Sequence, residues 1–81
     1  MTEKKIEIRK EIMEFAEEME RIMNKHDINK SDSWKTCDEG FLWKKLREEW
    51  KELDDCYSDE SKSKEFIDVA NVCMMLWNRL K

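Results

Sequence analysis

The sequence predicts an all-α protein, a three-helix chain that completes a helical bundle through oligomerisation. Charged residues make up 44% of the chain and hydrophobic residues 40%, with no proline and one glycine. Such a composition suits helices joined by short polar loops. Apolar residues also recur at steps of three and four, the spacing that places them on one face of a helix. At 81 residues the chain is expected to form a single domain, 1–81.

The first helix is expected to run from about Lys4 to about His26. It carries one apolar stripe, formed by Ile8, Ile12, Phe15, Ala16, Met19, Ile22 and Met23. This face is expected to pack inward. The polar segment "DINKSDSW" should end the helix, because short polar side chains compete for backbone hydrogen bonds.

The second helix is expected to run from Thr36 to about Asp55. The segment "TCDE" has the form of a capping box, with Thr36 as the cap and Glu39 three residues later. Its stripe includes Phe41 and several leucines.

The third helix is expected from about Lys64 onward, with Ser61 or Ser63 as its cap. It is apolar almost all round and should therefore be the central, most buried helix. Two neighbouring helices cannot cover that much apolar surface. The chain is therefore expected to associate with copies of itself, as a homodimer or homotetramer.

The charge pattern narrows the classes of partner. The net charge is −4 and no basic stripe stands out, which argues against a nucleic acid polymer as partner. The opening "MTEKKIEIRKE" is too charged for a signal peptide, and no apolar run approaches the roughly 20 residues of a membrane span. We expect a cytoplasmic protein without a membrane partner. Cys37, Cys56 and Cys73 are expected to be reduced thiols that serve packing.

Acidic residues interrupt the apolar faces of two of these helices. Glu49 falls within the leucine stripe of the second helix, and Asp68 lies inside the apolar run of the third. A buried carboxylate is costly unless something pairs with it. Three explanations stay open: divalent cations between the acids, protonation of the acids, or pairing with Lys44, Lys45, Arg47 or Lys51. For Glu48 a solvated helix face is a further alternative.

The acids also form a recognisable pair of motifs. "EEWKE" contains Glu48, Glu49 and Glu52, and twelve residues separate it from "EFID", which contains Glu65 and Asp68. This arrangement resembles the EExxE…ExxD signature of the all-α nucleoside triphosphate pyrophosphohydrolases, the MazG-like superfamily. The segments "VANVCMM" and "FAEEMERIM" are also similar to the family.

The resemblance implies an enzyme that hydrolyses a nucleoside or deoxynucleoside triphosphate to the monophosphate and pyrophosphate, as in housecleaning of nucleotide pools. It implies Mg²⁺ or Mn²⁺ held by four acids: Glu49, Glu52, Glu65 and Asp68. Oxygen-only ligands suit such hard ions. Glu48 and Glu49 are the catalytic candidates, with Glu48 as a base for water or as a group behind the metal ligands. Assembly as a dimer or tetramer is also implied.

Three further residues are candidates for binding the substrate. Trp34 occupies a place where related enzymes carry an aromatic residue near the nucleobase, and it would either stack on the base or anchor the loop. Asn71 would hydrogen-bond the base or sugar, or satisfy a carboxylate. Arg79 would contact phosphate, or lie solvated at the helix end. Trp43 and Trp50 are assigned to the core or to a subunit interface.

A different class of function stays open, a non-catalytic helical module for protein interaction. In that case the apolar faces of the first and third helices bind a partner and the acids are incidental. Millimolar Mg²⁺ distinguishes the two, because only a carboxylate cluster should respond to it. Base and sugar specificity depend on the shape and hydrogen bonds of a pocket, which one sequence does not display.

Overall fold

The computed structural model describes residues 5–27 and 32–81, and the regular structure in these residues is helical. The elements are, in order, α1 (Lys10–Asp27), the short 3-10 helix η1 (Ser33–Lys35), α2 (Glu39–Asp54) and α3 (Asp59–Leu80). The predicted all-α class and the three helices are confirmed.

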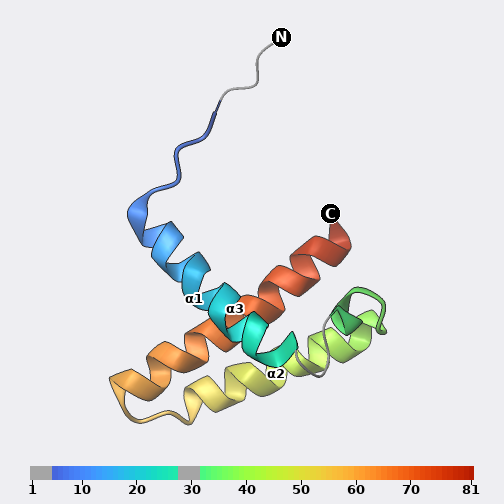
Figure 1. Ribbon diagram of the computed structural model, residues 1–81. Coiled ribbons are helices and arrows are strands. Elements are labelled where there is room, and N and C mark those ends of the chain that lie inside the picture. Colours follow the sequence, from blue (N-terminus) through green and yellow to red (C-terminus); the bar gives the residue numbers. More distant parts are fainter. Residues whose placement is uncertain (1–4, 28–31) are drawn as a thin grey trace.

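The third helix lies at the centre, as predicted, because it packs against both other helices. Figure 1 shows α2 and α3 side by side in opposite directions, while α1 crosses α3. The innermost contacts join α2 to α3. Leu42 is 2% exposed, Val72 3% and Leu76 4%, and together they form the apolar core. Burying side chains of this size supplies much of the stability of so small a fold.

The first helix begins later than its apolar pattern predicts. It starts at Lys10, and residues 5–9 are not helical. The predicted start, Lys4, lies outside the described residues, as do residues 28–31 of the connection to η1. The inward-facing stripe is confirmed only near the end of α1, where Met19, Ile22 and Met23 are half-buried. Ile12 is 53% exposed and Phe15 43%.

The second helix does not use the predicted capping box. It begins at Glu39 and its N-cap is Asp38. Thr36 instead closes η1, where its hydroxyl donates to the carbonyl of Ser33 at 3.5 Å. The prediction of Thr36 as cap is wrong because a separate tight turn takes up residues that the capping box would need.

The third helix begins at Asp59, five residues before the predicted start at Lys64. Its N-cap is Ser58, whose hydroxyl accepts a hydrogen bond from the backbone N–H of Ser61 at 3.1 Å. The prediction of Ser61 or Ser63 as cap is therefore wrong. The earlier start places Asp59 and Glu60 in the first turn, where the helix dipole favours negative charge.

Two tryptophans lie outside the core of the single chain. Trp43 is 41% exposed and Trp50 62%, so their assignment to the core is wrong, and a role at a subunit interface stays a prediction. The three cysteines are free thiols, as predicted. Among the described helices, none is both long and apolar enough to cross a membrane.

Candidate functional site

Three carboxylates from two helices meet beside the core. Glu49 of α2 and the pair Glu65 and Asp68 of α3 each place an oxygen within 4.8 Å of the others. Glu65 and Asp68 are three residues apart and share one face of α3. The antiparallel packing of α2 on α3 turns that face towards Glu49. Three of the four predicted metal ligands are thus brought together.

Glu49 is the buried member of this acidic cluster, with 9% of its surface exposed. Its Oε1 lies 3.4 Å from Nζ of Lys45, one turn earlier on α2. Its Oε2 is buried without a hydrogen-bond partner, and so is Oε2 of Glu65. An unsatisfied buried acceptor costs about 1–3 kcal/mol. These acceptor oxygens of the acidic cluster can therefore bind one more positively charged partner, either a proton or a cation.

The pKa values show where a proton would sit. Burial raises the pKa of Glu65 to about 8, and the hydrogen bond to Glu49 and the charges of the neighbouring acids act in the same direction. Burial also works to raise the pKa of Glu49. The hydrogen bond with Glu65 and the charge of Lys45 outweigh that effect and hold this pKa below its usual value. A carboxyl group with this pKa keeps its proton at neutral pH, so Glu65 is the member of the cluster that is protonated when no metal is bound.

The other two predicted acids lie further out. Glu52 is exposed but lines the pocket described below, and its charge contributes to the raised pKa of Glu65. Glu48 is exposed and is not among the residues that line this pocket. Its position agrees with the alternative of a solvated helix face.

A pocket of about 300 Å³ opens beside the acidic cluster. Its lining changes from apolar to acidic along the two antiparallel helices. On α2 the lining residues run from Phe41 at the apolar end of the pocket to Glu49 at the acidic end. On α3, which is antiparallel to α2, they run from Met75 at the apolar end back to Asp68 at the acidic end. Trp34 of η1 adds to the apolar side. The pocket can therefore hold a ligand that is charged at one end and flat or apolar at the other.

The position of Trp34 is compatible with both roles that the sequence left open, stacking on a base and anchoring the loop. It packs against the apolar core, as a loop anchor would, and it also lines the pocket. Its indole Nε1 is buried and has no hydrogen-bond partner among residues 5–27 and 32–81. Nζ of Lys35 lies 5.6 Å from the centre of its ring.

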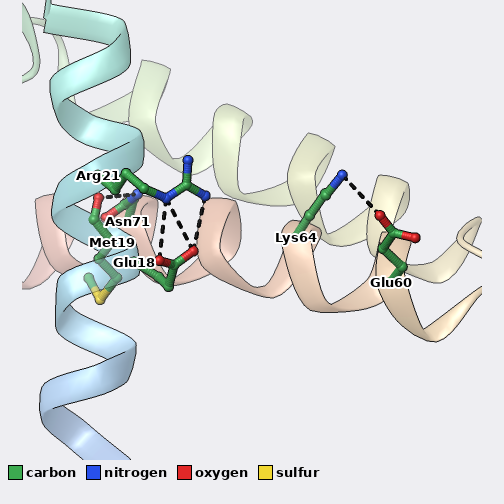
Figure 2. A network of polar contacts seen from close by, with 6 residues as sticks. All are labelled: Glu18, Met19, Arg21, Glu60, Lys64 and Asn71. Carbon is green, nitrogen blue, oxygen red and sulfur yellow. Dashed lines mark hydrogen bonds and ion pairs between the residues drawn. The ribbon is translucent and has the colours of Figure 1, made fainter.

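Asn71 is buried, with 4% of its surface exposed, and lines the same pocket. Its Nδ2 donates to the backbone carbonyl of Met19 at 3.3 Å, which ties α3 to α1 (Figure 2). Its Oδ1 is buried without a partner. The amide nitrogen of Asn71 thus has a structural role, while its amide oxygen can accept a hydrogen bond from a ligand.

Arg79 is not among the residues that line the pocket. Its Nη1 donates to the backbone carbonyl of Trp34 at 2.9 Å. Its guanidinium thus contacts the protein backbone, and its side chain is half-buried rather than fully solvated at the helix end.

Sequence reasoning did not single out Phe41 and Met75 as pocket residues. The signal was present in their spacing. Phe41, Lys45, Glu49 and Glu52 follow one another at steps of four and three, and so share a face of α2. Met75 follows Asp68 by two such steps on α3.

Fold and site together define a class: an all-α protein with a carboxylate cluster at one end of a half-apolar pocket. The sequence matches no known protein family, and neither the curated proteins nor the solved structures contain a match.

Proposed function

We propose that this protein is a cytoplasmic, Mg²⁺-dependent nucleoside triphosphate pyrophosphohydrolase of the MazG-like kind. One observation carries the proposal. A carboxylate oxygen of Glu49, buried and without a hydrogen-bond partner among the described residues, lies at the acidic end of a pocket whose other end is apolar. The spacing of the acidic motifs in the sequence supports the same reading independently.

The donor set fits a hard divalent cation. Glu49, Glu65 and Asp68 would hold Mg²⁺ or Mn²⁺ through carboxylate oxygens, and Glu52 lines the pocket within the same group of acids. The cation would neutralise phosphate charge and lower the pKa of a coordinated water. Since a proton at Glu65 competes for the same oxygens, it has to leave when the cation binds.

The chain's own residues would divide the remaining work. Glu49 is ionised at neutral pH, so it can accept a proton from the attacking water. The water oxygen bonds to the α-phosphorus as pyrophosphate leaves. Lys45 lines the pocket and brings positive charge to the phosphates. Glu48 lies further from the cluster and is the weaker catalytic candidate.

The apolar side of the pocket suits the base and sugar. Trp34 and Phe41 offer aromatic surface, on which any base can stack. The oxygen of Asn71 can accept a hydrogen bond from the base or sugar. We further propose that the active form is a homodimer or homotetramer, because much apolar surface of the single chain is exposed.

The test is a screen of common and modified nucleoside triphosphates with Mg²⁺, in which released pyrophosphate is measured. Asp68→Ala should abolish turnover of the best substrate while the helical circular dichroism is kept. Asp54→Ala is the matched control, because Asp54 is an exposed acid at the end of α2 outside the pocket. Wild-type turnover in Asp68→Ala would exclude Asp68 from the site.

A second function, the non-catalytic interaction module, is favoured by a different observation. Large apolar side chains such as Ile12, Phe66 and Trp77 are more than half exposed, at 53%, 52% and 65%. Exposed apolar surfaces of this kind often mark the sites at which a protein binds its partners. If this is the function, the protein should release no pyrophosphate from any triphosphate, and its stability should ignore Mg²⁺.

A further inference from the structure

Arg79 links the end of α3 to η1, the turn that carries the pocket residue Trp34. It lies in the last turn of α3, and its Nη1 donates to the carbonyl of Trp34 at 2.9 Å across 45 residues of sequence. The same nitrogen lies 3.9 Å from Sγ of Cys37. The end of α3 is thus joined to the turn that carries Trp34.

Trp34 and Cys37 pack against the apolar core, but the other polar contacts of this turn among the described residues are short-range in sequence. η1 spans only Ser33–Lys35, and its backbone hydrogen bonds are local ones, such as Lys35 N–H to the carbonyl of Asp32 at 2.9 Å. The thiol of Cys37 also lies 3.7 Å from the carbonyl of Trp34, but a thiol is a weak donor. The guanidinium is charged and therefore a strong donor.

We propose that Arg79 is a positioning residue, which fixes the Trp34 turn as one wall of the pocket. Ligand affinity then depends on a residue that does not line the pocket. For a nucleoside triphosphate ligand the inference rests on the proposed function. The hydrogen bond between Arg79 and the Trp34 carbonyl does not depend on that function, because both partners belong to the protein.

The geometry predicts which replacements of Arg79 restore the contact. The guanidinium meets a single carbonyl oxygen, so one charged N–H donor is enough. Arg79→Lys keeps such a donor and should behave almost as wild type. Arg79→Gln keeps a neutral donor on a shorter side chain and should lie between Arg79→Lys and Arg79→Met. Arg79→Met keeps the apolar stem, loses the donor and should release the turn.

Fluorescence tests this positioning role without reference to activity. Trp43, Trp50 and Trp77 are 41%, 62% and 65% exposed, so replacing all three with phenylalanine leaves Trp34 as the only tryptophan at low structural cost to the single chain, and its emission is excited selectively over that of Tyr57. In this background Arg79→Met should move the Trp34 emission to longer wavelength and increase its quenching by acrylamide. Lys81→Met is the matched control, since it removes one positive charge from the same end of the chain. It should change neither the emission wavelength of Trp34 nor its quenching by acrylamide. Trp34 fluorescence unaffected by Arg79→Met and Arg79→Gln would overturn the proposal.

Kinetics in the protein with all its tryptophans then test the consequence for the pocket. Arg79→Met should raise KM for the best triphosphate about tenfold, equivalent to about 1.4 kcal/mol, and leave kcat nearly unchanged. Arg79→Lys should restore KM. A fall in kcat at unchanged KM would overturn the positioning role. If wild type turns over no triphosphate, the proposed function fails, while the fluorescence result still decides the role of Arg79.

Discussion

At the scale of single residues, the unusual feature is a carboxyl group, that of Glu65, whose raised pKa keeps it protonated at neutral pH beside the ionised Glu49. Glu65 and Glu49 lie in a cluster whose oxygens approach within 4.8 Å, and the pKa of Glu65 is raised to about 8. Two ionised carboxylates this close repel each other, and burial increases the cost. The proton therefore replaces the positive charge that a bound cation would bring.

This pair predicts a pH dependence for the metal-free protein. The pKa of Glu65 rises from 4.5 to about 8 on folding, so between these values the folded chain holds a proton that the unfolded chain has lost. The unfolding free energy should therefore fall as pH rises through this window, by at most about 1.4 kcal/mol per pH unit. The lowered pKa of Glu49 acts in the opposite sense, but only below pH 4.5. Urea unfolding in a chelating buffer measures the slope.

Glu65→Gln should flatten this profile, because glutamine keeps an N–H donor towards Glu49 and cannot titrate. Glu60→Gln changes an exposed acid of the same helix and should keep the wild-type slope. Equal slopes in wild type and Glu65→Gln would show that the proton is held elsewhere.

The cluster also predicts a response to metal. An ion that binds only the folded state stabilises it by about 1.4 kcal/mol at tenfold excess over its dissociation constant. Mg²⁺ should therefore raise the melting temperature of wild type, and Glu49→Gln should lose most of that rise. Without Mg²⁺, Glu49→Gln should lower the melting temperature, because it removes the charge that pairs with Lys45, so the comparison is between the Mg²⁺-induced rises of the two proteins. Equal Mg²⁺ shifts in both proteins would remove Glu49 from the site.

At the scale of elements, the start of α3 depends on a cap that the sequence pattern did not identify. The Ser58 hydroxyl accepts a hydrogen bond from the Ser61 N–H at 3.1 Å. Ser58→Ala should lower the unfolding free energy by about 1 kcal/mol. Thr36→Ala removes the predicted cap of α2 and should cost much less, since the hydroxyl of Thr36 makes only a 3.5 Å contact within η1. Chemical denaturation of both variants measures the difference, and the reverse order of costs would contradict the observed caps.

The same elements show what sequence could and could not predict. Apolar residues at steps of three and four were enough for the three helices and for the central place of α3, because burial of one face dominates helix stability. Glu49 and Asp68 stood out because each interrupts such a face. The ends of α1 and α2 were predicted close to the observed Asp27 and Asp54, but the helix starts were missed. For α2 and α3, several residues near the start can cap the helix and their capping energies differ little. The contact of Arg79 with Trp34 was out of reach, because nothing local relates residues 45 positions apart.

At the scale of the whole molecule, the single chain leaves much apolar surface uncovered. Phe15 of α1 and Phe66 of α3 line a second hollow between the two helices, and they are 43% and 52% exposed. Trp50 and Trp77 are 62% and 65% exposed. A chain with so small a core gains stability when such surface is buried against another copy.

We therefore predict a symmetric homo-oligomer, at least a dimer, whose interface includes Phe15 and Phe66. Sedimentation of the wild type at micromolar concentration should give a multiple of the chain mass of 10.0 kDa. Replacing both phenylalanines with serine removes apolar area from the interface and should weaken association at least about tenfold, a loss of about 1.4 kcal/mol. The helical content of one chain should change little, because both side chains are already about half exposed. Tyr57→Ser is the control, since Tyr57 is 98% exposed in the loop between α2 and α3 and lies outside this hollow. A monomer mass for wild type at this concentration would contradict the oligomer, and association unchanged in the double variant would place the interface on another face.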